Sequence, residues 1–176
     1  MPLLHLLVTG ILFVINPAVQ ASSAHHHGHR HAHGEVEVEL VLEANGRLSG
    51  HLKGAMDGFL PFEHVPKTDA QRKLVSELRS NLVKPNWLVS VNPEGRCEQE
   101  SVRAVSPIFE GKDSGGHANL EVEFSLRCAN PEMIRALNFE VLSNNKRLKK
   151  VELEFVGPKG QAKAVLTTRK PQFLLP

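Results

Sequence analysis

The stretch EVEVELVLEANGRLSGHLK, residues 35–53, predicts a β-hairpin and sets the fold class. Valine and leucine alternate with glutamate over most of residues 35–43, which is the period-two pattern of a strand with one buried face. Residues 44–46, Ala-Asn-Gly, then provide a turn. We therefore expect two antiparallel strands at the start of the folded region.

The length of the turn decides the register of this hairpin. A two-residue Asn-Gly loop would set Glu43 against Leu48, whereas a three-residue loop with Gly46 in the left-handed conformation sets Leu42 against Leu48. We favour the three-residue loop, because it pairs opposite charges on the solvent face and apolar residues on the core face. The predicted pairs are Glu37 with Lys53, Glu39 with His51, and Val38 with Leu52.

A single long helix is predicted after the hairpin. Thr68 and Gln71 have the spacing of a capping box. Pro85 disfavours helical backbone at the preceding residue, so the helix should end near Lys84. The apolar residues at helical spacing are Ala70, Leu74, Val75, Leu78 and Leu82.

Strand patterns dominate the rest of the chain. The candidates are Trp87–Val91, Cys97–Ile108, His117–Cys128, Leu148–Val156 and Gln161–Thr168, with a short helical turn at Pro131–Ala136. Residues 157–160, Gly-Pro-Lys-Gly, are typical of a last hairpin turn. The predicted fold class is α+β, mainly antiparallel β-sheet built from β-hairpins, with one long helix.

Residues 1–21 predict a secretory signal peptide. They contain no Asp, Glu, Lys or Arg, and their apolar stretch, Leu3–Val14, is too short to span a bilayer as a helix. Cleavage after Ala21 fits the small-residue preference of such sites, although a basic start is missing, and an uncleaved anchor stays open as an alternative. We expect a periplasmic product without stable membrane insertion.

The two cysteines, Cys97 and Cys128, predict a disulfide in an exported protein. A hairpin that turns through residues 111–116 would bring them opposite each other at its open end. Two buried free thiols are the alternative.

Length, charge and sequence motifs restrict the domain organisation and the class of protein. A chain of 176 residues fits one core, so we expect a signal peptide (1–21), a tail (22–34) and a single α+β domain (35–176). The net charge is +2 and aromatic residues make up 5%, which argues against a nucleic-acid partner. Nucleophile-elbow, phosphate-loop and zinc-peptidase motifs are absent from the sequence, so we expect no enzyme.

The tail carries the strongest chemical signal, SSAHHHGHRHAHG at residues 22–34. Six of the ten histidines of the chain lie there: His25, His26, His27, His29, His31 and His33. Neutral imidazole suits zinc, copper and nickel, and alternate rings of an extended chain point to the same side. We predict a zinc site with copper or nickel as alternatives; a solvated linker without function is the other interpretation.

Two histidines outside the tail are further candidate ligands. His117 opens a strand after a Gly-rich turn, from where it could reach a shared ion. His64 lies in an aromatic and proline-rich loop, where it is either a ligand or a structural histidine near Glu63.

Several short segments of the chain also match one known family. They are HAHG at 31–34, GF at 58–59, FEHVPKT at 62–68, Cys97, HAN at 117–119, RCANP at 127–131 and GPKGQ at 157–161. With them the chain resembles the ZrgA-type family of zinc-regulated proteins from Gram-negative bacteria. The resemblance implies periplasmic zinc binding in support of an import system. Family members often have a second histidine-rich insert before the position of His117, which this chain lacks.

These observations lead to two functional hypotheses. In the first, the protein is a zinc-binding accessory protein whose tail gathers the ion and passes it to an import permease or a solute-binding protein. In the second, it is a structural or adhesion-like exported β module whose tail only buffers metal.

Overall fold

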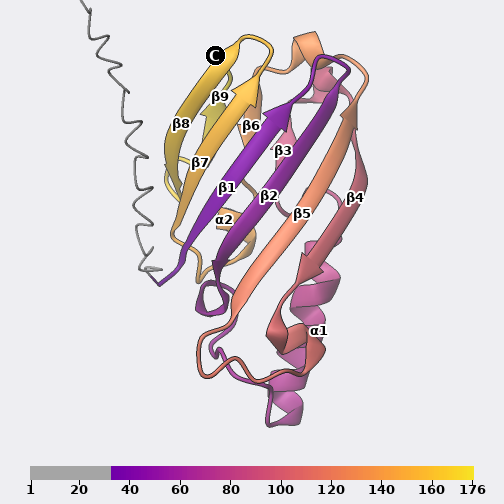
Figure 1. Ribbon diagram of the computed structural model, residues 1–176. Helices are drawn as coiled ribbons and strands as arrows, with labels where there is room; N and C mark the ends of the chain where they lie inside the picture. The colour runs from indigo at the N-terminus through magenta and orange to yellow at the C-terminus, as the bar shows by residue number, and fades with distance from the viewer. Residues whose placement is uncertain (1–32) are drawn as a thin grey trace, which may run out of the picture.

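The computed structural model describes residues 33–176 as two layers of β-sheet with one long helix (Figure 1). The predicted signal peptide and the histidines at positions 25–31 lie outside these residues. Within residues 33–176 no helix has the length and apolar character needed to cross a bilayer.

The larger layer is a six-stranded sheet with the strand order β4-β5-β2-β1-β7-β8. Strands β1 and β7 pair in parallel, and the other four neighbouring pairs are antiparallel. Its strands are β1 (Glu35–Leu42), β2 (Arg47–Ala55), β4 (Cys97–Val105), β5 (Asn119–Cys128), β7 (Lys150–Gly157) and β8 (Gly160–Thr167).

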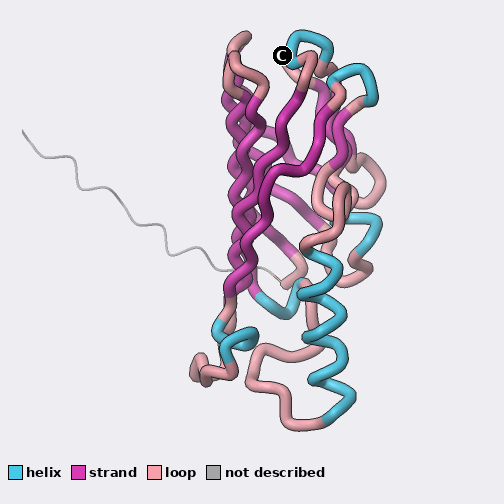
Figure 2. Tube along the Cα trace, turned by 90° about the vertical axis from the view of Figure 1, so that its right-hand side faces the viewer, coloured by secondary structure: helices cyan, strands magenta, loops and turns pink. Residues whose placement is uncertain are grey.

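The smaller layer is a three-stranded sheet that lies behind the upper part of the first sheet (Figures 1 and 2). It is made of β3 (Ser90–Val91), β6 (Ala136–Asn138) and β9 (Gln172–Leu174). The helix α1 (Asp69–Leu82) lies at the lower end, behind β4, and the short helix α2 (Val141–Asn144) precedes β7. This arrangement confirms the α+β class with a mainly antiparallel sheet and one long helix.

The register of the first hairpin is as predicted. Gly46 has φ +85°, and Leu42 pairs with Leu48. The predicted pairs Glu37–Lys53, Val38–Leu52 and Glu39–His51 are all present. The alternation therefore sends Val36, Val38, Leu40 and Leu42 into the core between the layers, whereas the glutamates of β1 and Val41 point outward.

The long helix begins as expected. Thr68 Oγ1 accepts from Gln71 N, and the Gln71 side chain accepts from the backbone of Thr68, which completes the capping box. The helix ends at Leu82, close to the predicted Lys84. Of its apolar residues Val75, Leu78 and Leu82 are buried, while Leu74 is exposed.

Several predicted strands were too long. The strand from Cys97 stops at Val105, because Pro107 has no N–H for the sheet and Ser106 Oγ accepts from Ile108 N instead. Of Trp87–Val91 only the last two residues form a strand. The helical turn at Pro131 ends at Met133, before the unpredicted strand β6, and α2 and β9 were also missed.

Gly50 on β2 supports a prediction about core packing. A Cβ at this position would lie 2.2 Å from Phe124 Cζ and 2.7 Å from Leu40 Cδ2. Gly50→Ala is therefore expected to lower the free energy of unfolding by about 1–3 kcal/mol through overpacking, measured by chemical denaturation. Ser49→Ala, the neighbouring position on the outer face, is the control. Equal stability of the two variants would contradict this account.

Candidate metal-binding end of the sheet

The chain joins the sheet through Gly34. Its φ of +75° is left-handed, and a Cβ there would lie 2.6 Å from the carbonyl oxygen of Arg147. The carbonyl of Gly34 accepts from Lys149 N at 2.7 Å and from Lys150 N at 3.2 Å. This close approach places the preceding residue, His33, beside the start of β1, which lies at the lower end of the sheet in Figure 1.

His33 forms a pair with Asp57, which lies in a short 3-10 helix (Met56–Gly58) directly after β2. His33 Nδ1 donates to Asp57 Oδ2. The two side chains differ in exposure: His33 is 90% exposed and Asp57 is 15% exposed. The hydrogen bond to Asp57 and the charge of Asp57 raise the pKa of His33 above its ordinary value, and the charge of Glu63 adds to this. The end of the sheet therefore favours positive charge on His33.

A second pair lies at the same end. Glu63 Oε2 is 3.6 Å from His117 Nδ1, and again the carboxylate is enclosed, at 18% exposure, while the imidazole is 93% exposed. The hydroxyl of Ser114, in the loop before His117, donates to the carbonyl oxygen of Glu63 at 3.3 Å. This contact ties the Gly-rich loop to the loop that carries Glu63.

The connection between α2 and β7 holds the backbone of the segment that carries Asp57. The buried Asn145 donates from Nδ2 to the carbonyl oxygen of Gly58 at 3.0 Å. Arg147 Nε donates to the carbonyl oxygen of Asp57 at 2.8 Å. The backbone around Asp57 is thus fixed, while its Oδ1 atom is buried and has no hydrogen-bond partner among the described residues.

His64, the third predicted ligand within the structure, has a different setting. Its ring centroid lies 5.3 Å from that of Phe62, and Nδ1 donates to the carbonyl oxygen of Val65 at 2.9 Å. Its neighbour in the sequence, Glu63, pairs with His117. These contacts fit the structural interpretation of His64, and its role as a ligand stays a prediction.

The structure thus brings two of the predicted ligands, His33 and His117, to one end of the sheet, each beside a carboxylate. For the part of the chain that is described, no three His, Cys, Asp or Glu side chains stand close enough to hold a metal ion as they are placed. Sequence reasoning did not single out Asp57 and considered Glu63 only as a neighbour of His64. The missed signal was an acidic residue just beyond β2, where the predicted register already sets it against His33.

The fold and the two histidine–carboxylate pairs define a class of protein. It is a two-layer β protein with such pairs at the end of the sheet where its N-terminal segment joins. The family model described as "ZrgA family zinc uptake protein" matches residues 30–175, and the chain belongs to this family. Comparison with curated proteins found no match. The protein accordingly has a role related to zinc uptake, and the family is described by uptake rather than by a catalysed reaction.

Proposed function

We propose that this protein is a periplasmic zinc-binding accessory protein that captures zinc with its histidine-rich segment, residues 22–34, and delivers it to an import system. The observation that carries the proposal is the bond between His33, the last histidine of that segment, and Asp57 of the folded part. A zinc ion held by the tail reaches a carboxylate of the domain through this residue.

The chemistry of the tail supports capture. Zinc is commonly bound by four ligands in a tetrahedron, and imidazole nitrogen is a preferred donor. Six histidines within residues 25–33 offer more nitrogens than one ion needs. The receiver of the ion would be an import permease or a solute-binding protein, which the zinc-uptake description of the family suggests.

Two further features support a periplasmic location of the protein. Residues 1–21 have the pattern of a secretory signal peptide, removed to leave residues 22–176. Cys97 and Cys128 form a disulfide, the ordinary state of paired cysteines in the periplasm of a Gram-negative bacterium.

The test is a zinc titration of the processed protein by calorimetry at neutral pH. In a tail variant, the five histidines before His33 are replaced by alanine: His25, His26, His27, His29 and His31. We expect the tail variant to lose most of the bound zinc equivalents, because its nitrogens are gone. Copper and nickel titrations show how far the tail selects its ion, since imidazoles alone favour copper over zinc.

His51→Ala is the matched control, because it removes one histidine on the outer face of β2, and it should leave the titration unchanged. An unaltered protein that releases no heat with zinc would refute the proposal. A tail variant that binds as much zinc as the unaltered protein would refute capture by the tail.

A further inference from the structure

The ends of three strands bring His33, Asp57 and His117 into one row. Extending the β1–β2 register beyond the strands sets His33 opposite Asp57, and extending the β2–β5 register sets His117 opposite Asp57 as well. The bond from Met56 N to the carbonyl oxygen of Ala118, 2.8 Å, keeps the β2–β5 register up to the adjacent residue. His33 and Asp57 are in direct contact at these strand ends.

Glu63 completes this group from the neighbouring loop. It is in contact with His117, and its charge acts on His33. Both acidic side chains are mostly enclosed by protein, whereas both imidazoles project into solvent. The group thus consists of two mostly enclosed carboxylates, each in contact with one exposed imidazole.

Nearby basic side chains leave the carboxylate of Asp57 available. Arg147 Nε donates to the backbone carbonyl of Asp57, not to its carboxylate. Lys149 Nζ donates to the carbonyl oxygen of Lys146 at 2.7 Å. The buried Asp57 Oδ1, which has no partner within residues 33–176, is an acceptor that a bound cation would satisfy.

We propose that Asp57, Glu63, His117 and His33 form a zinc site at the folded domain, which shares only His33 with the histidine-rich tail. Two imidazole nitrogens and two carboxylate oxygens are a donor set that zinc accepts in four-coordinate geometry. In the structure the side chains stand as two pairs, and the proposed site requires the exposed imidazoles of His33 and His117 to turn so that both pairs reach one ion.

This site deepens the proposed function, on which it rests. Because His33 is the last histidine of the tail and also a member of the domain site, zinc passes between the two without being released to solvent. Ligands held by a folded domain lose less conformational freedom on binding than ligands on a flexible segment. The domain site is therefore expected to fill before the tail.

The test uses the tail variant described above, which keeps His33, titrated with zinc against a chromophoric chelator. We expect one zinc equivalent to remain. Asp57→Asn, Glu63→Gln and His117→Ala, each added to the tail variant, are expected to lower its zinc affinity by at least about tenfold. His117 is almost fully exposed, so its replacement tests the site without a risk to folding.

Glu121→Gln is the matched control, because Glu121 is also paired with a histidine, His51 at 4.0 Å, on the same sheet face. It should leave the zinc affinity unchanged. A tail variant that binds no zinc, beside an unaltered protein that does, overturns the domain site and leaves capture by the tail intact. A zinc equivalent that survives all three substitutions also overturns it. Absence of binding by the unaltered protein refutes both proposals together.

Discussion

Replacement of both Cys97 and Cys128 by serine is expected to lower the free energy of unfolding by about 3–4 kcal/mol in the chain-entropy account of disulfides. The two cysteines are separated by 31 positions and pair directly across β4 and β5. Without the bond, the unfolded chain regains the freedom that the closed loop removes. Chemical denaturation of the oxidised protein and the double-serine variant measures the difference.

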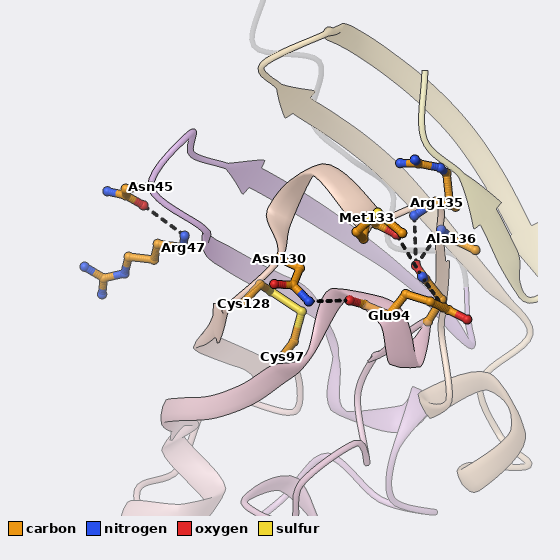
Figure 3. Close-up of a disulfide and its surroundings, with 10 residues drawn as sticks. Asn45, Arg47, Glu94, Cys97, Cys128, Asn130, Met133, Arg135 and Ala136 are labelled. Atoms are coloured by element: carbon orange, nitrogen blue, oxygen red, sulfur yellow. Dashed lines mark hydrogen bonds between the residues drawn. A yellow bond between two sulfur atoms is a disulfide. The ribbon is translucent and has the colours of Figure 1, made fainter.

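The surroundings of the disulfide favour retention of the native structure in that variant. Beyond Cys128, Ala129 N donates to the carbonyl oxygen of Arg96 and Asn130 N to that of Gly95, both at 3.1 Å. Asn130 Nδ2 also donates to the carbonyl oxygen of Glu94 at 3.1 Å (Figure 3). These bonds hold the open end of the hairpin after the covalent link is removed.

Zinc binding provides the control for this prediction. The disulfide joins the first residue of β4 to the last residue of β5, whereas His33 and His117 precede the first residues of β1 and β5, which start at the opposite end of the sheet (Figure 1). The folded double-serine variant should therefore bind zinc as the oxidised protein does, and reduction of the unaltered protein should reproduce its loss of stability. A stability loss below about 1 kcal/mol would contradict the chain-entropy account.

The parts of the fold that were predictable from sequence are those with long periodic patterns or specific turn chemistry. The three-residue loop at Gly46 followed from pairing opposite charges, and it fixed the register of β1 and β2. The alternation of β5 indicated its buried face, and its hairpin with β4 set Cys97 opposite Cys128. In each case local side-chain chemistry allowed one arrangement to be preferred.

The second sheet was not predictable in the same way. Strands β6 and β9 have three residues each, which is too few for a period of two to stand out. The parallel pairing of β1 with β7 was also missed, because alternation tells which face of a strand is buried but not which strand lies beside it. These features depend on contacts between distant parts of the chain.

The candidate site was partly predictable. His33 and His117 were named from residue type and position, but their carboxylate partners come from loops whose paths depend on packing. Asp57 follows β2 in a 3-10 helix, and Glu63 lies in a loop held by buried apolar residues. Extending the predicted β1–β2 register past the strand ends would have found Asp57; nothing comparable in the sequence indicates the contact between Glu63 and His117.

Phe62→Ala is expected to have a stability effect similar to loss of the disulfide, about 3–5 kcal/mol, because the buried ring leaves a cavity. Phe62 belongs to the core and directly precedes Glu63, so its burial holds the loop that presents this carboxylate. The zinc affinity of the tail variant should therefore fall when Phe62→Ala is added. Chemical denaturation and the chelator competition measure the two effects.

Two comparisons separate this anchoring role from a general loss of stability. Leu174→Ala truncates an apolar side chain that is 67% exposed on β9, and it should change stability by no more than about 0.5 kcal/mol. Gly50→Ala weakens the core of the sheet away from the loop, so at zinc concentrations where the protein is folded it should leave the domain site intact. If Phe62→Ala destabilises the fold but the folded protein keeps its zinc affinity, Glu63 is positioned by its contacts with Ser114 and His117 rather than by the packing of Phe62.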